Sequence, residues 1–126
     1  MSLQMMLVVD DEVQMRRVLS ASLSVHGYQV IEAESGEEAL NRLSAERCDF
    51  VLLDLNLPGM DGIATCRAIR AHSEVPIIVM SIRDSEKDKA AAREAGADDY
   101  ITKPFGIEKL LSCVTEVSRR KSEFGS

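Results

Sequence analysis

The chain has 126 residues, a length that predicts one domain with at most a short tail. Hydrophobic residues make up 45% of it and charged residues 29%, close to the average for globular proteins, which excludes an intrinsically disordered or collagen-like chain. The 15 Lys and Arg residues against 21 Asp and Glu give a net charge of −6, which argues against direct binding of nucleic acid by this domain.

Apolar runs alternate with amphipathic segments along the chain. Short apolar runs predict strands buried in a sheet, at residues 5–9, 28–33, 50–53, 76–80 and 100–102. Apolar residues at helical spacing predict helices over 13–26, from 36, around 63–69, over 87–95 and from 107. The inward stripe of the first helix is expected to contain Met15, Val18, Leu19 and Leu23. Ser35 and Glu38 match a capping box, which predicts the start of the second helix.

The strict alternation of strand and helix predicts an α/β fold, with a five-stranded parallel sheet and helices on both of its faces. Sheets of this kind bind ligands outside the carboxyl ends of their strands. The polar residues that follow the strands are therefore the candidates for a functional site.

Neither a disulfide framework nor a membrane span is expected. The cysteines, Cys48, Cys66 and Cys113, are odd in number and lack Cys-x-x-Cys spacing, which also argues against a zinc site. No apolar run approaches the roughly 18 residues that a membrane span needs. A reducing, cytoplasmic location without a membrane partner fits this pattern best.

Four of the predicted strands are followed by a reactive or ion-binding side chain. These are Asp10 and Asp11 after the first strand, Asp54 after the third, Ser81 after the fourth and Lys103 after the fifth. Converging carboxylates with no nearby His or Cys favour a hard cation such as Mg²⁺. An Asp beside such an ion can act as a nucleophile towards a phosphoryl group, and Asp54 is the central candidate. Lys103 supplies a point charge for a phosphoryl oxygen, and Ser81 supplies a hydroxyl donor.

Each of these residues also has an ordinary structural interpretation. An Asp after a strand is often a helix cap, a lone Ser is mostly a loop residue, and a lone Lys is mostly solvated. The combination at successive strand ends is what favours a phosphate-binding site over these separate explanations.

Three motifs strengthen that interpretation. They read VDDE at 9–12, LLDLNLPGMDG at 52–62 and GADDYITKPF at 96–105. With them, the chain resembles the receiver domain of two-component response regulators, which are phosphorylation-controlled signalling switches. The resemblance covers residues 5–120 and implies the flavodoxin-like (βα)5 fold, with strand order 2-1-3-4-5 and a receiver domain at 5–121.

The resemblance also implies roles for individual residues. Asp54 would accept a phosphoryl group from a sensor histidine kinase. Asp11, Asp54 and the backbone carbonyl of Asn56 would bind Mg²⁺ or Mn²⁺, with Asp10 acting through water. No substrate is turned over in such a domain, which catalyses only its own phosphorylation and dephosphorylation.

Signal transmission is the second function that the resemblance implies. Ser81 and Tyr100 would be a switch pair, in which the hydroxyl moves towards the phosphoryl group and the aromatic ring turns inward behind it. The pair would alter the face formed by the fourth helix, fifth strand and fifth helix. Lys103 would pair with the phosphate, and its peptide bond to Pro104 is expected to be cis.

Within the family, the motif at 97–106 is similar to the OmpR/PhoB class, and residues 73–79 are similar to the KdpE type. Members of that class control transcription through a C-terminal DNA-binding domain, and we expect no such effector domain within this chain. The chain is therefore interpreted either as a truncated regulator or as a stand-alone receiver that acts on a protein partner. Residues 1–4 and 122–126 are expected to be tails or cloning remnants.

Three residues depart from the class pattern. Lys109 stands where an acidic residue is usual and Cys113 where an arginine is usual, which predicts a weakened homodimer on activation. Ile82 follows the switch serine where a small residue is customary. We expect its bulk to restrict access to the site.

Other functions with a similar fold fit the residues less well. A haloacid dehalogenase phosphatase has its nucleophile after the first strand in an Asp-x-Asp pattern, which residues 10–12 do not match. A flavodoxin-like FMN carrier needs a neutral phosphate loop there, and this loop is acidic. A pseudo-receiver usually lacks the acceptor Asp or the Lys, and both are present.

Overall fold

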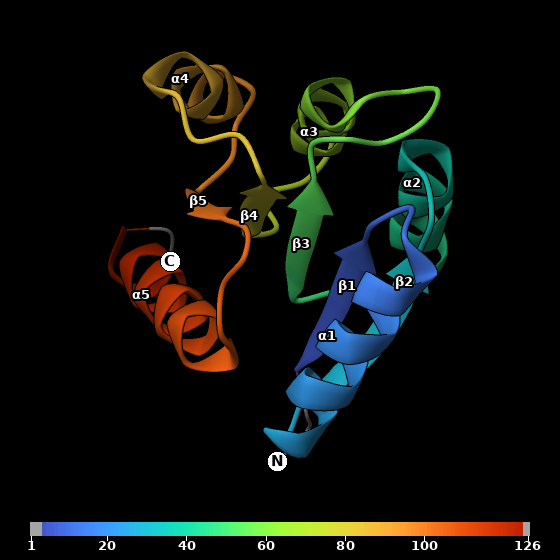
Figure 1. Ribbon diagram of the computed structural model, residues 1–126, viewed down its shortest axis with the longest axis vertical. Helices are drawn as coiled ribbons and strands as arrows, with labels where there is room; N and C mark the ends of the chain where they lie inside the picture. The colour runs from blue at the N-terminus through green and yellow to red at the C-terminus, as the bar shows by residue number, and fades with distance from the viewer. Residues whose placement is uncertain (1–3, 125–126) are drawn as a thin grey trace.

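The computed structural model describes residues 4–124, which form an alternating series of strands and helices (Figure 1). The strands are β1 (Met5–Val9), β2 (Gln29–Ala33), β3 (Phe50–Asp54), β4 (Ile77–Ser81) and β5 (Asp99–Thr102). The helices are α1 (Val13–Val25), α2 (Gly36–Ala45), α3 (Gly62–Arg70), α4 (Glu86–Glu94) and α5 (Ile107–Phe124). None of these helices is both long enough and apolar enough to cross a membrane.

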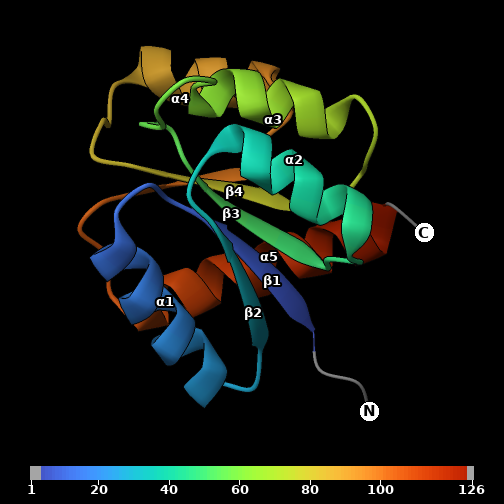
Figure 2. The ribbon, with the colours of Figure 1, turned by 90° about the vertical axis from the view of Figure 1, so that its right-hand side faces the viewer.

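All neighbouring strands are parallel, and their order is β2-β1-β3-β4-β5. Figure 2 shows α1 and α5 on one face of the sheet and α2, α3 and α4 on the other. The α/β class, the strand order and the placement of helices on both faces are thus confirmed. The order reverses at β1, so the carboxyl ends of β1 and β3 border the crevice where such sheets bind ligands.

Two hydrophobic cores lie on opposite faces of the sheet, because successive side chains of a strand point to opposite sides. In β1, Leu7 and Val9 face the core under α2, α3 and α4, whereas Met6 and Val8 face the core under α1 and α5. All four side chains are fully buried. Burial on both faces explains why the strands read as continuous apolar runs.

The predicted stripe of α1 is wrong at one residue. Leu19 and Leu23 are buried against the sheet, but Val18 is 60% exposed. Leu19 and Leu23 lie four residues apart on one line of the helix, and Val18 is about 100° away from that line. The apolar character of Val18 alone did not show whether its side chain faces the sheet or the solvent.

Helix ends follow the sequence signals closely. The Ser35 hydroxyl accepts a hydrogen bond from the Glu38 backbone N–H at 3.1 Å, as the capping box predicts. The Glu38 carboxylate accepts from the Glu34 N–H at 2.7 Å, one residue earlier than the reciprocal bond of that motif. At the other end of the chain, α5 reaches Phe124, so part of the expected C-terminal tail is helical, while residues 1–3 and 125–126 lie outside the described part.

Gly62 allows α3 to begin directly behind the carboxyl end of β3. Its backbone N–H donates to the Leu55 carbonyl at 3.0 Å. A Cβ at this position would collide with the Leu55 Cα and lie 2.5 Å from the Asp54 carbonyl oxygen. Backbone atoms cannot rotate away as a side chain can, so this close approach requires glycine.

We therefore expect Gly62→Ala to lower the free energy of unfolding by about 1 to 3 kcal/mol, because the helix must shift to relieve the collision. Gly106→Ala is the matched control, since a Cβ there meets nothing within 4 Å. Its loss of stability should stay below about 1 kcal/mol, which is the typical contribution of a helix cap. Urea denaturation followed by circular dichroism measures both. Equal losses in the two variants would contradict the role assigned to Gly62.

Candidate functional site

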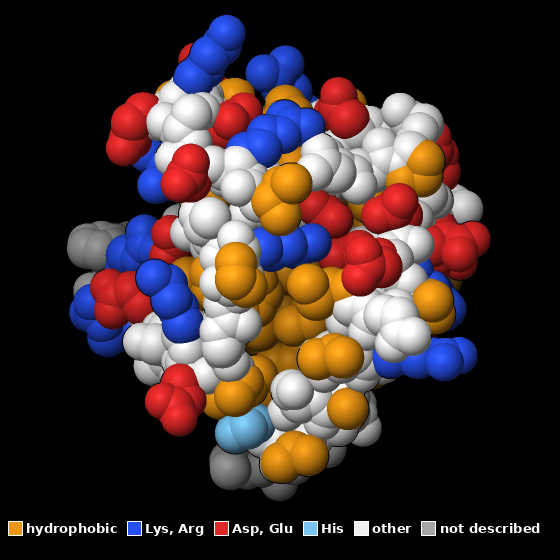
Figure 3. All heavy atoms as spheres, viewed as in Figure 1, with side chains coloured by type: hydrophobic (Ala, Val, Ile, Leu, Met, Phe, Trp, Pro, Cys, Tyr) orange, Lys and Arg blue, Asp and Glu red, His pale blue; other side chains and the backbone are white. Residues whose placement is uncertain are grey.

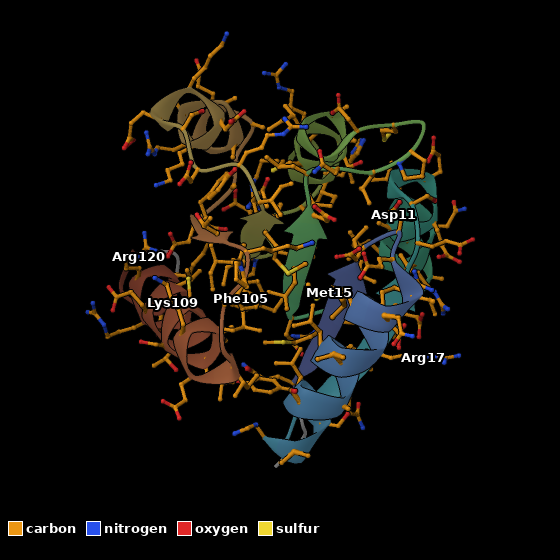
Figure 4. The ribbon with its side chains drawn as sticks, viewed as in Figure 1. Asp11, Met15, Arg17, Phe105, Lys109 and Arg120 are labelled. Atoms are coloured by element: carbon orange, nitrogen blue, oxygen red, sulfur yellow. The ribbon has the colours of Figure 1, made fainter. Side chains whose placement is uncertain are left out.

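The carboxyl ends of the parallel strands gather the predicted site residues at one edge of the sheet. Asp10 directly follows β1, Asp54 is the last residue of β3, Ser81 is the last residue of β4 and Lys103 follows β5. Figure 4 labels Asp11 at the same edge, beside the start of α1. The convergence expected from the order of elements is therefore present.

Three carboxylates form the centre of this site. One oxygen from each of Asp10, Asp11 and Asp54 lies within 4.8 Å of the others. Asp10 and Asp54 are only 1% and 4% exposed, whereas Asp11 is exposed to solvent. The group is therefore buried on its protein side and open on the side of Asp11.

Lys103 neutralises part of this negative charge. Its Nζ atom lies 3.1 Å from Asp10 Oδ2 and 3.2 Å from Asp54 Oδ2 and bonds to both. The backbone N–H of Lys103 donates to the Ser81 carbonyl at 2.7 Å, which fixes the loop after β5 against β4. The peptide bond between Lys103 and Pro104 is cis, as expected.

The environment shifts the protonation of both partners. Burial raises the pKa of the Asp54 carboxyl above its ordinary value, and the charge of Asp10 raises it further, against the opposing effects of the Asn56 N–H and of Lys103. Burial alone would lower the pKa of the Lys103 ammonium. The hydrogen bonds and negative charges of Asp10 and Asp54 outweigh that effect and hold the Lys103 pKa above its ordinary value.

The donor set fits a divalent hard cation. Three carboxylates against one ammonium leave a net negative charge, and all candidate ligands are oxygen atoms. Two of the buried oxygens have fixed partners: Asp10 Oδ1 accepts from the Glu12 N–H at 2.9 Å, and Asp54 Oδ1 accepts from the Asn56 N–H at 3.1 Å. These bonds fix one oxygen of each carboxylate, and the other oxygen of each bonds to Lys103.

Ser81 and Tyr100 lie on neighbouring strands and share one contact residue. Ser81 is fully buried, and its hydroxyl oxygen accepts a hydrogen bond from the Arg83 N–H at 3.0 Å. The half-buried Tyr100 ring packs against the core under α2, α3 and α4, and its hydroxyl donates to the Arg83 carbonyl at 2.8 Å. Sequence reasoning missed Arg83, because it stands in a loop outside the three motifs.

Ile82 lies between these contacts, directly after Ser81. Its side chain is 68% exposed and belongs to neither of the described cores. The expectation that Ile82 restricts access to the site stays a prediction.

The surface around the site combines charge with an apolar hollow. Figure 3 shows acidic side chains gathered around a basic one, and below them a hollow with an apolar floor between α1 and α5. Met15 of α1 and Phe105 of the β5–α5 loop point into this region (Figure 4). A cavity of about 520 Å³ lies elsewhere, between the ends of α2 and α3 at the amino ends of β3 and β4, and the carboxylates do not line it.

The family model of the response regulator receiver domain matches residues 6–115. The chain belongs to this family. It is 44% identical over 118 residues to the transcriptional regulatory protein KdpE of Mycobacterium tuberculosis, which covers 94% of this chain and 52% of that protein. It is 41% identical over 126 residues to the probable transcriptional regulator ycf27 of Porphyridium aerugineum, which covers 100% of this chain and 52% of that protein.

Among solved structures, the chemotaxis protein CheY4 of Vibrio cholerae superposes with a TM-score of 0.88 at 32% identity, covering 92% of this chain and 99% of that one. The match to KdpE confirms the predicted likeness to that type within the OmpR/PhoB class. The receiver domain spans about half the length of the curated relatives named above.

The α4–β5–α5 face of this receiver domain has unusual chemistry. The Cys113 thiol donates to Asp99 Oδ2 at 3.0 Å, and burial together with this hydrogen bond raises the Cys113 pKa to about 12. Arg120 lies 3.7 Å from the same carboxylate oxygen. Asp99 therefore has partners within its own chain, while Lys109 lies exposed on α5 (Figure 4).

The raised pKa of Asp54 has a consequence for stability. The folded protein holds the Asp54 proton more tightly than the unfolded chain does, so ionisation of this carboxyl lowers stability as the pH rises through that range. We expect Asp54→Asn to increase the free energy of unfolding at pH 7 by on the order of 1 kcal/mol in metal-free buffer, because Lys103 retains Asp10 as a partner.

The increase should shrink in acid, where the wild-type carboxyl is also neutral. Urea denaturation at several pH values measures it, with Glu12→Gln as a control that removes an exposed carboxylate. A lower stability of Asp54→Asn at pH 7 would show that the pair with Lys103 outweighs the cost of burial.

Proposed function

We propose that this receiver domain is a phosphorylation-activated switch in which Asp54 accepts the phosphoryl group. One observation supports this most directly: the buried Asp54 carboxylate belongs to the acidic cluster with Asp10 and Asp11 and bonds to the Lys103 ammonium at the carboxyl edge of the sheet. That environment offers a nucleophile, a cation for a phosphoryl oxygen and a place for a second cation.

In the proposed reaction, an Asp54 carboxylate oxygen attacks the phosphorus of a phosphohistidine on a sensor histidine kinase. The new P–O bond forms as the P–N bond breaks, and the imidazole nitrogen keeps the electron pair and takes a proton from water. Attack by water on the phosphorus later breaks the P–O bond and returns the carboxylate and inorganic phosphate. The domain thus catalyses only its own modification.

Mg²⁺, or Mn²⁺, is the proposed cofactor. The Asp11 and Asp54 carboxylates and the Asn56 backbone carbonyl would bind it directly, and Asp10 would act through water. When bound, the ion neutralises charge that develops on the phosphoryl oxygens. Lys103, whose ammonium bonds to Asp54, would contribute a second positive charge and hold the product in place.

Ser81 and Tyr100 are the proposed switch pair. The Ser81 hydroxyl can donate a hydrogen bond to a phosphoryl oxygen while its own oxygen still accepts from the Arg83 N–H. The Tyr100 ring follows this change and alters the α4–β5–α5 face. A weak homodimer through that face is the proposed consequence, since Lys109 offers no carboxylate and Cys113 no guanidinium for ion pairs between subunits.

The histidine kinase would approach over the hollow between α1 and α5, which lies beside the acidic site (Figure 3). Met15 and Phe105 offer apolar contacts there, next to the carboxylate that must be reached. The proposed output is transcriptional control through a C-terminal DNA-binding domain, as the names of the curated relatives suggest. A stand-alone receiver that regulates a protein partner is the alternative.

We expect Asp54→Asn to abolish phosphate uptake from acetyl phosphate, because an amide is a far poorer nucleophile than a carboxylate. Mass spectrometry of the intact protein detects the added phosphoryl group. Removing Mg²⁺ with EDTA should have the same effect on the wild type, and Glu12→Gln should be modified normally. Uptake by Asp54→Asn at the wild-type rate would assign the acceptor to another residue.

For Ile82→Ala, we expect both loading by acetyl phosphate and loss of phosphate to accelerate severalfold, equivalent to about 1 kcal/mol of barrier. The smaller side chain would open the path to the phosphorus for the donor and for water, without touching Asp11, Asp54 or Lys103. A phosphate-release time course at fixed Mg²⁺ measures the effect. Val18→Ala, which trims another exposed aliphatic side chain, is the control, and unchanged or slower release from Ile82→Ala would leave Ile82 without a gating role.

A further inference from the structure

Arg83 contacts several parts of the candidate switch at once. It lies in the short connection between β4 and α4, and its backbone N–H and carbonyl bond to Ser81 and Tyr100. Its guanidinium donates to the Asn56 side-chain oxygen in the β3–α3 loop and lies 3.7 Å from the Asp88 carboxylate on α4. One residue therefore touches both members of the proposed switch pair and the loop that follows Asp54.

These contacts form a continuous chain of hydrogen bonds. The Asn56 N–H donates to Asp54 Oδ1 at 3.1 Å, the Asn56 side-chain oxygen accepts from the Arg83 guanidinium, and the Arg83 carbonyl accepts from the Tyr100 hydroxyl. This series of hydrogen bonds begins at Asp54, the proposed phosphoryl acceptor, and ends at Tyr100 on β5. Of the residues in this series, only Arg83 and Tyr100 have long side chains.

The contact with Asn56 is the shorter of the two that the guanidinium makes. A charged donor bound to an amide oxygen gives a charge-assisted hydrogen bond. The pair with Asp88 is 3.7 Å long, beyond hydrogen-bond distance, and the Arg83 side chain is 49% exposed, so solvent screens this ion pair. The guanidinium therefore ties the β4–α4 connection mainly to the β3–α3 loop.

We propose that Arg83 is a positioning residue that couples Asp54 to Tyr100. Its guanidinium holds the peptide of residue 83 against the β3–α3 loop, at the place where the carbonyl meets the Tyr100 hydroxyl. A rearrangement of the loop when Asp54 gains a phosphoryl group then reaches Tyr100 through this side chain. This inference rests on the proposed function of Asp54 and assigns Arg83 to the regulation of the same site.

The side chain and the backbone of Arg83 can be tested separately. Arg83→Ala removes the guanidinium but keeps the N–H that bonds to Ser81 and the carbonyl that bonds to Tyr100. Arg17→Ala is the matched control, because it removes the same charge from an exposed residue of α1 whose side chain points away from the site (Figure 4).

The readout is the ¹⁹F NMR signal of Tyr100. The chain contains two tyrosines, so a Tyr28→Phe background labelled with 3-fluorotyrosine gives one signal, from Tyr100. We expect Arg83→Ala to shift this signal in the free protein. We also expect it to weaken, by roughly two- to tenfold, the population change of Tyr100 caused by Mg²⁺ and beryllofluoride, a phosphoryl mimic, as the loss of one hydrogen bond implies.

Amide shifts around Asp54 report beryllofluoride binding independently of Tyr100. Binding that persists in Arg83→Ala with a weakened Tyr100 response supports the coupling. Tyr100 signals identical to those of Arg17→Ala would overturn it, and so would loss of binding in Arg83→Ala, which would place Arg83 in ligand binding. If the wild type binds no beryllofluoride, the proposed function of Asp54 fails, and the free-state signals still decide whether Arg83 positions Tyr100.

A second variant tests the route. Asn56→Ala removes the amide oxygen that Arg83 contacts and keeps the backbone. If Arg83 acts through Asn56, the double variant should match Arg83→Ala in its Tyr100 signal, because both changes remove the same bond. Additive effects of the two substitutions would contradict this route.

Discussion

The structure depends on the balance of charge at the carboxyl edge of its sheet. Asp10 and Asp54 are buried side by side, a placement that mutual repulsion and loss of hydration both disfavour. Lys103 bonds to both and compensates one of the negative charges. The remaining negative charge, together with exposed Asp11, makes the edge receptive to a divalent cation. The excess negative charge is what the proposed divalent cation would neutralise, and the Lys103 ammonium is what the proposed phosphoryl group would contact.

The fold supplies the rigidity that holds this balance. Asp10 follows β1 and Asp54 ends β3, and the apolar side chains of both strands are buried on both faces, so the backbone at these two residues is held in place. The close approach of Gly62 to the backbone behind Asp54 fixes the loop in the same way. Backbone N–H groups of Glu12 and Asn56 then orient the two buried carboxylates.

Much of this architecture could be predicted from the sequence, because burial and topology leave strong local signals. Continuous apolar runs located the strands, and parallel topology placed Asp54 and Lys103 at one edge. Contacts between side chains of distant loops leave no such signal. The direction of Val18 depended on how α1 rotates against the sheet, and the bond between Arg83 and Asn56 depended on the relative position of two loops.

The short strand β5 connects the site to the α4–β5–α5 face. Within five residues it carries Asp99, Tyr100 and, just past its end, Lys103. Alternation along the strand directs Asp99 towards Cys113 of α5 and Tyr100 towards the opposite core, while Lys103 reaches the carboxylates. A strand of four residues, paired only with β4, has few bonds that resist a small displacement. A force on Lys103 therefore acts on the same segment that presents Tyr100 and Asp99 to α4 and α5.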